Sequence, residues 1–149
     1  IIFNSTKISL LFKLYDIVCS TIPQYLREII MNLINGDCIE EMNKLVPHSI
    51  DLVATDLPYG VTKNYWDNII PLDKLWESFW KVLKPTGKIV LTASQPFCSM
   101  LISSQPKYFK YDLIWSKNKS SGFLNAKKQP LRSHESILVF AKKSGTYNP

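Results

Sequence analysis

The stretch Ile50-Asp51-Leu52-Val53-Ala54-Thr55-Asp56-Leu57-Pro58-Tyr59-Gly60 decides the fold. Its first six residues are mostly apolar or β-branched, which predicts a strand over 50–55. The following residues, from Asp56 to Gly60, include an acid, a proline and a glycine, which are common where a strand ends in a turn. The sequence therefore predicts a carboxylate and an aromatic ring at the carboxyl end of a strand, where open α/β sheets bind ligands.

Outward from this strand, short β-branched runs alternate with helical stretches, which is typical of an α/β sheet. We predict further strands over Leu33-Ile34, 88–93, 111–116 and 135–141, and helices over 39–45 and 97–103. A longer helix begins at Pro71 and ends at Lys84-Pro85-Thr86-Gly87, since its apolar residues recur at spacings of three and four: Leu72, Leu75, Trp76, Phe79 and Leu83. We expect a partial Rossmann-like sheet, mostly parallel with an antiparallel last strand, with helices on both faces and a polar loop over 117–134.

The size and composition fit one globular domain. The chain has 149 residues, of which 46% are hydrophobic, enough to build a core. The first methionine is Met31, and residues 1–30 show no clean helical or alternating period. We interpret residues 1–30 as an upstream extension outside the domain; the alternative is an N-terminal helix around 23–30 that packs on the sheet.

The cysteines and apolar stretches indicate the compartment. Cys19, Cys38 and Cys98 are odd in number and form no Cys-x-x-Cys pair, which favours neither a disulfide framework nor a zinc site. With only His48 and His134 as histidines, we expect no metal. The apolar stretch 8–22 contains two charged residues and is too short to span a bilayer. These features predict a soluble, cytoplasmic protein without a membrane partner.

Positive charge is concentrated in the C-terminal third. The net charge is +6, and residues 107–143 carry nine Lys or Arg against two acids. Such a surface suits a polyanion, because neutralising phosphates releases condensed counterions; a solvated basic surface is the alternative. Lys127, Lys128 and Arg132, with Phe123 nearby, are the candidates for phosphate contacts.

The chain from Met31 to Pro149 resembles the amino-methylating DNA methyltransferases, whose motif is (Asp/Asn/Ser)-Pro-Pro-(Tyr/Phe/Trp). The resemblance rests on Asp56-Leu57-Pro58-Tyr59, on Asn35-Gly36-Asp37-Cys38 and, most specifically, on the run from Asn125 to Phe140. One departure is Leu57, which stands where the motif usually has Pro. Asp rather than Ser at position 56 resembles adenine-N6 members more than cytosine-N4 members.

This resemblance implies a site-specific enzyme, of the kind found in restriction-modification systems, that transfers a methyl group from S-adenosylmethionine to N6 of adenine in double-stranded DNA. The adenine amine is a poor nucleophile because its lone pair is delocalised, so catalysis needs acceptors for its two hydrogens. Asp56 can accept one and a backbone carbonyl at the Leu57-Pro58 step the other, while Tyr59 offers a ring on which an extruded base can stack. A plain turn after a strand is the alternative interpretation of these four residues.

The resemblance also implies that Asp37 bonds the adenine edge of S-adenosylmethionine, although a helix N-cap ahead of Ile39 explains Asp37 equally well. The pair His134-Glu135 is expected to help shape the target pocket. Family members with this loop near the N-terminus carry a later Phe-x-Gly-x-Gly segment. The five glycines of this sequence do not form such a motif. We therefore expect residues 31–149 to be the N-terminal catalytic part of a methyltransferase domain, truncated before that segment, with weak cofactor binding.

Several alternatives remain beside adenine methylation. One is a catalytically inactive remnant that binds DNA, and another is a cytosine-N4 methyltransferase. Methylation of RNA or of protein glutamine is a weaker alternative, because glutamine-directed relatives resemble the pattern with Asn at position 56. A homodimer is one arrangement that we consider.

Overall fold

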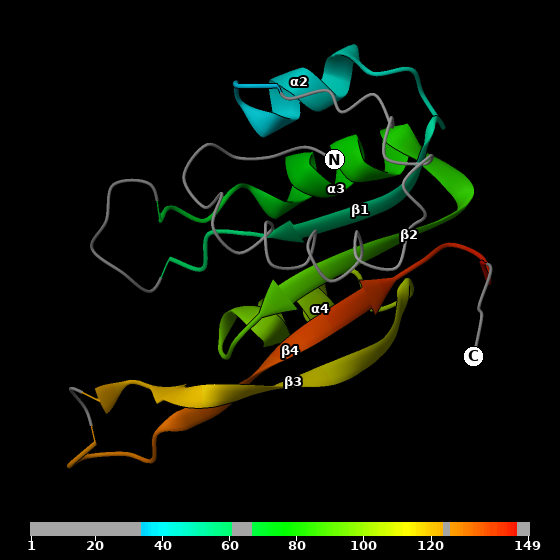
Figure 1. Ribbon diagram of the computed structural model, residues 1–149. Helices are drawn as coiled ribbons and strands as arrows, with labels where there is room; N and C mark the ends of the chain where they lie inside the picture. The colour runs from blue at the N-terminus through cyan, green and yellow to red at the C-terminus, as the bar shows by residue number, and fades with distance from the viewer. Residues whose placement is uncertain (1–33, 61–66, 124–125, 146–149) are drawn as a thin grey trace, which may run out of the picture.

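The computed structural model describes residues 34–60, 67–123 and 126–145 (Figure 1). In chain order, the elements within these ranges are α2 Cys38–Lys44, β1 Ile50–Asp56, α3 Leu72–Val82, β2 Leu83–Ala93, α4 Phe97–Ser104, β3 Phe109–Ser121 and β4 Arg132–Phe140. The expected extension 1–30, with its alternative helix, lies outside the described residues, as does the boundary at Met31. Of the strand expected at Leu33-Ile34, only Ile34 is described, and it is not in a strand.

The described strands form one mixed sheet in the order β1-β2-β4-β3. β1 pairs with β2 in parallel, and β4 lies antiparallel to both of its neighbours, β2 and β3. It follows that β1, β2 and β3 run in one direction and β4 runs against them. The α/β class and the antiparallel last strand are therefore confirmed, with four strands among the described residues rather than the five that we expected.

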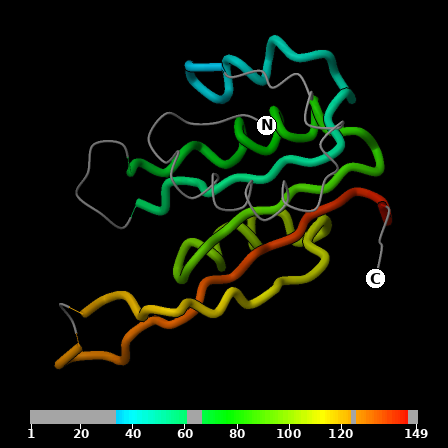
Figure 2. The backbone as a smooth tube through the Cα atoms, viewed as in Figure 1, coloured from blue at the N-terminus to red at the C-terminus, as the bar shows by residue number. Residues whose placement is uncertain are grey.

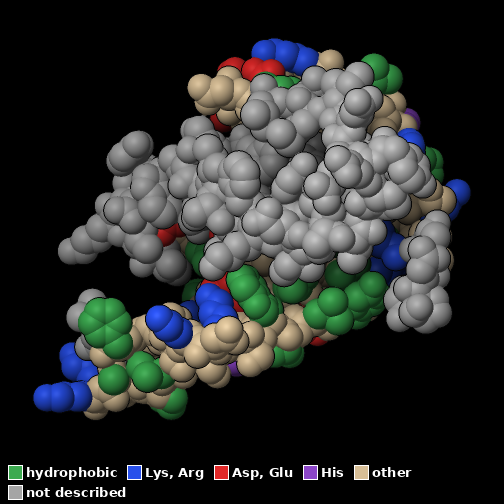
Figure 3. Space-filling view, viewed as in Figure 1, with side chains coloured by type: hydrophobic (Ala, Val, Ile, Leu, Met, Phe, Trp, Pro, Cys, Tyr) green, Lys and Arg blue, Asp and Glu red, His purple; other side chains and the backbone are tan. Residues whose placement is uncertain are grey.

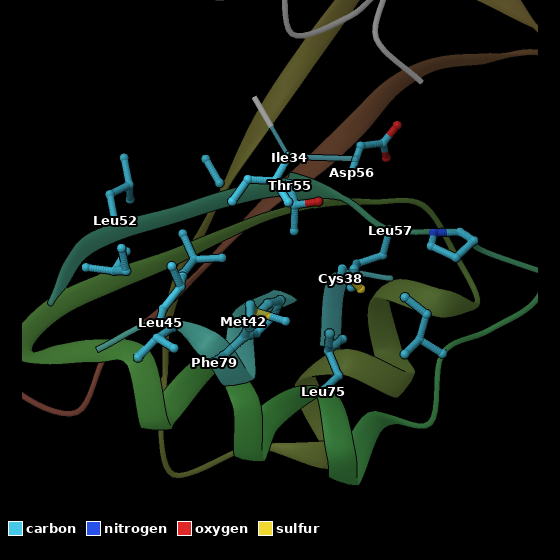
Figure 4. Close-up of a pocket in the computed structure, with 16 residues that line it drawn as sticks. Ile34, Cys38, Met42, Leu45, Leu52, Thr55, Asp56, Leu57, Leu75 and Phe79 are labelled. Carbon is cyan, nitrogen blue, oxygen red and sulfur yellow. The ribbon is translucent and has the colours of Figure 1, made fainter. Parts of the chain in front are cut away.

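The core lies on one face of this sheet. Ile89 and Leu91 alternate along β2 and are fully buried, and their partners on β4, Phe140 and Leu138, are fully buried as well. Paired residues of neighbouring strands point to the same face, so these four side chains form a continuous apolar layer. All three described helices pack on this face (Figure 4). We expected helices on both faces, and among the described residues helices cover one face of the sheet.

The apolar stripe of α3 fills the space above this layer. Leu75, Trp76, Phe79 and Val82 are buried, and burying each contributes about 1.5–3 kcal/mol. The Trp76 ring lies 4.9 Å from the ring of Phe140, centroid to centroid, which ties α3 to β4. The helix ends at Val82, so Leu83, which the spacing placed in the helix, begins β2 instead.

The polar loop expected over 117–134 is wrong in its extent, because both of its ends belong to strands of a β-hairpin. β3 continues to Ser121, β4 begins at Arg132, and these two residues pair with each other. Backbone pairing satisfies N–H and C=O groups even where the side chains are polar, a stabilisation that the hydrophobic pattern does not report. The far end of this hairpin projects beyond the rest of the sheet (Figures 1 and 2).

Across 34–60, 67–123 and 126–145, helices are all too short or too polar to cross a membrane.

Candidate active site

Asp56 is the last residue of β1, and hydrogen bonds fix its carboxylate. Its Oδ1 atom accepts a hydrogen bond from the Tyr59 hydroxyl at 2.7 Å and one from the Thr92 hydroxyl at 2.7 Å. Thr92 is the residue of β2 that pairs with Asp56, so both side chains lie on the same face of the sheet. Figure 4 shows the carboxylate pointing away from the helices. The structure thus holds this acceptor at the carboxyl end of the sheet, outside the core.

Tyr59 folds back over the strand end. Its ring stacks on the Phe97 ring at 5.4 Å between centroids and 27° between planes, and its hydroxyl also lies 3.3 Å from the Thr92 hydroxyl oxygen. Burial raises the pKa of the Tyr59 phenol above its usual value, and the charges of Asp56 and Glu135 raise it further. The hydrogen bond with Thr92 lowers this pKa, but by less than the other effects raise it. The phenol therefore stays protonated at neutral pH and acts as a hydrogen-bond donor to Asp56.

Leu57, which stands where the family motif usually has Pro, packs in the core. Its side chain is only 4% exposed and belongs to the core, on the side opposite to the Asp56 carboxylate (Figure 4). Leu57 contributes packing through its side chain, which leaves its backbone carbonyl as the group available for chemistry. Pro58 follows directly and is partly buried.

The loop after Tyr59 needs a glycine. Gly60 has φ +67°, and a Cβ at this position would lie 2.8 Å from Cγ1 of Ile69. Its N–H donates a 2.9 Å hydrogen bond to Oδ1 of Asp67, a carboxylate that is only 5% exposed. The buried Asp67 carboxylate thus fixes the end of the Asp56–Gly60 loop through this hydrogen bond.

A cavity of about 200 Å³ lies next to the first residues of this loop, Asp56, Leu57 and Pro58. Its walls come from α2, β1 and α3, and the labelled side chains of Cys38, Met42, Leu57, Leu75 and Phe79 surround it in Figure 4. The lining is mainly apolar. Asp56, Leu57 and Pro58 also line it, so the cavity adjoins the candidate catalytic loop, although the Asp56 carboxylate points to the other face of the sheet.

Asp37 caps the helix at the edge of this cavity. Its Oδ1 accepts hydrogen bonds from the backbone N–H groups of Ile39 at 2.9 Å and Glu40 at 3.1 Å. The N-cap interpretation is therefore confirmed, and a cofactor role for Asp37 stays a prediction. The next residue, Cys38, lines the cavity, and burial, followed by the charge of Asp37, raises the pKa of its thiol.

The candidate phosphate-binding residues lie on the β3–β4 hairpin. Lys127 and Lys128 are exposed in the connection between the strands, and basic side chains gather at that end of the hairpin in Figure 3. Arg132 is also exposed, but its Nη1 atom donates a 3.2 Å hydrogen bond to the backbone carbonyl of Gln95. Because Gln95 follows the end of β2, Arg132 lies nearer to the carboxyl edge of the sheet than the two lysines.

Three polar residues beside the site were not identified from the sequence. They are Thr92, Asp67 and Lys117, whose ammonium group forms an ion pair with Glu135. Thr92 could have been found by continuing the period of two along its strand, whereas Asp67 comes from a loop without regular pattern. Across the described ranges, His, Cys, Asp and Glu side chains form no group of three that could hold a metal ion.

Comparison with known proteins places this geometry in a family. The N6/N4 family model, described as DNA methylase, matches residues 50–148. The chain belongs to this DNA methylase family. Family membership covers the Asp56–Gly60 loop, the core strands and the β3–β4 hairpin together.

One curated protein and two solved structures are similar to this chain, the structures in fold. The DNA adenine methyltransferase YhdJ of Escherichia coli (strain K12) is 30% identical over an alignment 131 positions long that covers 77% of this chain and 42% of that protein. Among solved structures, the cytosine-N4-specific PvuII DNA methyltransferase is similar with a TM-score of 0.56 and 19% identity, over 76% of this chain and 50% of that one. The complex of M1.HpyAVI with SAM gives a TM-score of 0.53 and 20% identity, over 74% of this chain and 54% of that one. The chain thus spans about half or less of the length of these relatives.

Proposed function

We propose that the protein containing this chain methylates N6 of adenine in double-stranded DNA, with S-adenosylmethionine as the methyl donor. The observation that carries the proposal is the Asp56 carboxylate, fixed by Tyr59 and Thr92 at the carboxyl end of β1, in a chain of the DNA methylase family. The relative that is 30% identical is named a DNA adenine methyltransferase, which favours adenine over cytosine.

The cavity beside Asp56 fits part of such a cofactor. Pockets that bury a drug-sized ligand have volumes of roughly 300–1,000 Å³, so the cavity of about 200 Å³ suits one flat apolar group rather than the whole molecule. Cys38, Met42 and Phe79 line the cavity and would pack on an adenine ring. Asp37, the N-cap residue before Cys38, would accept a hydrogen bond from the amino group of that ring.

The chemistry of the loop follows from its hydrogen-bond capacity. The cofactor supplies an electrophilic methyl group when bound. Asp56 would accept one hydrogen of the adenine amine, and the Leu57 carbonyl the other, which concentrates the nitrogen lone pair toward the methyl group. The stacking contact with Phe97 holds the Tyr59 ring at the strand end, where it would stack on the target base.

Binding of DNA would come from the hairpin. Lys127, Lys128 and Arg132 are exposed and would contact phosphates, which fix the position of the duplex without reading its sequence. Arg132, through Gln95, joins this basic surface to the edge of the sheet where Asp56 lies. The hairpin would therefore direct bound DNA toward the candidate catalytic loop.

The experiment is to express the open reading frame that contains this chain and to analyse the nucleosides of treated DNA by mass spectrometry. We expect N6-methyladenine; a yield of N4-methylcytosine alone would reject the adenine proposal. The variant Asp56→Ala should lose about 10²- to 10³-fold in methylation rate, the range for removing one placed electrostatic group. Asp51→Ala is the matched control, because Asp51 lies on the same strand but pairs with Lys84. Equal activity in both variants would contradict the assigned chemistry.

A further inference from the structure

On the face of the sheet opposite the helices, the carboxyl edge carries a second aromatic side chain. Trp115 on β3 pairs with Glu135 on β4, and its side chain is 36% exposed. Leu113, two residues earlier, faces the same way and is 54% exposed. Because β1 and β3 run in the same direction, Trp115 lies toward the same edge of the sheet as Asp56.

A lysine lies over the Trp115 ring and pairs with a glutamate. The Lys117 ammonium lies 5.5 Å from the ring centroid and forms an ion pair with Glu135, and these two side chains are 24% and 20% exposed. Glu135 precedes Ser136, which pairs with Ala93, the residue after Thr92. Trp115, Lys117 and Glu135 therefore border the candidate active site.

We propose that Trp115 and Lys117 form a subsite for a DNA nucleotide next to the target base, with the base stacked on Trp115 and its phosphate bound by Lys117. The inference rests on the proposed function and adds two residues to it. Its ligand chemistry follows from the pair itself: an exposed ring stacks on a base, and an adjacent cation binds the attached phosphate.

The spacing of the strands decides which nucleotide this is. Three strand intervals of about 4.8 Å separate β1 from β3, so Trp115 lies roughly 14 Å or more from Asp56 across the sheet. One base cannot contact both residues, so Trp115 serves a neighbouring nucleotide. The Lys117 ammonium group has three N–H donors, so it can bind a phosphate and keep its ion pair with Glu135.

The surrounding charges favour this occupant. Lys119 follows on the same strand, and Lys127 and Lys128 lie exposed in the connection beyond it. A phosphodiester chain that runs from the Asp56 loop past Trp115 would continue along this basic hairpin, whose positive charge complements it.

The test uses the tryptophan fluorescence of the chain during titration with a short single-stranded deoxyoligonucleotide of mixed sequence. We expect quenching in the wild-type chain and loss of most of that quenching in Trp115→Phe, with nearly unchanged affinity, because phenylalanine still stacks. Trp115→Leu should weaken binding by about 5- to 150-fold, the range for losing one stacked base. Trp80→Phe, which removes a tryptophan of the α3 aromatic cluster, should keep the quenching.

The lysine is tested by the salt dependence of the same titration. Lys117→Gln should reduce the slope of log affinity against log salt by about 0.7, the value for one phosphate contact with a single strand, and should also alter the quenching. Lys74→Gln on α3, away from the hairpin, is the control and should leave the salt slope and the quenching unchanged. Absence of quenching in the wild-type chain, or wild-type affinity in Trp115→Leu, would overturn the inference. Because no methyl transfer is needed, this result is independent of the nucleoside analysis that tests the proposed function.

Discussion

Replacing Thr92 by valine tests whether the hydrogen bonds of Asp56 matter for catalysis. The substitution keeps the shape and the β-branch of the side chain but removes the hydroxyl that donates to Oδ1 of Asp56 at 2.7 Å. Hydrogen bonds to charged groups contribute about 1.5–3 kcal/mol, and partial exposure of this site favours the lower end. We therefore expect kcat/KM for DNA methylation to fall roughly 10- to 30-fold, since 1.4 kcal/mol corresponds to about tenfold.

The assay is transfer of a labelled methyl group from S-adenosylmethionine to DNA, with thermal unfolding measured in parallel. Thr92→Ser retains the hydroxyl and should stay within about threefold of wild type. If Thr92→Val methylates DNA at the wild-type rate while Asp56→Ala is inactive, the carboxylate does not need this donor, and the role given to Thr92 is refuted.

Three further predictions concern the loop, the phenol and the hairpin. A left-handed alanine costs roughly 1–2 kcal/mol, and Gly60→Ala should lower the free energy of unfolding by more than this, because its Cβ would also contact Ile69. Gly122→Ala, with φ +87° and open space around it, should cost only the left-handed conformation. Urea unfolding of both variants measures the difference. Tyr59 should stabilise the fold fully below pH about 10, the usual tyrosine pKa, and less as pH rises further, because the folded chain binds the phenol proton more tightly than the unfolded chain. Tyr59→Phe should reduce this alkaline decline of the free energy of unfolding. An unchanged decline would contradict the raised pKa. Lys128→Gln should reduce the salt slope of duplex binding by about 0.9, and Lys74→Gln on α3 should not; equal slopes would remove Lys128 from the DNA contacts.

The regular elements could be predicted because their hydrophobic periods are strong. The spacing of Leu75, Trp76 and Phe79 predicted α3 to within a residue of its end, and the apolar run before Asp56 predicted where β1 stops. The position of Asp56 at the carboxyl end of a strand was therefore readable from the sequence.

The remainder depends on contacts that no local pattern encodes. The period of two places Thr92 opposite the buried face of β2, but only the register of β1 against β2 shows that it meets Asp56. Asp67 reaches Gly60 from a separate loop segment. The polar extension of β3 to Ser121 is held by backbone pairing, so a hydrophobic pattern shortens it. Asp37 could not be assigned, because a helix cap and a cofactor ligand require the same carboxylate.

The place of β4 between β2 and β3 has a consequence for how the molecule opens and assembles. β3 joins the described sheet through β4 alone, and the two strands are close in sequence, so the hairpin can form early at a small loop-closure cost. Pairing β1 with β2 requires the longer crossover through α3. In amide hydrogen exchange, an opening that detaches β4 from β2 releases β3 with it. Protection of the β3 amides therefore cannot signal an intact sheet, because a detached hairpin keeps the same hydrogen bonds.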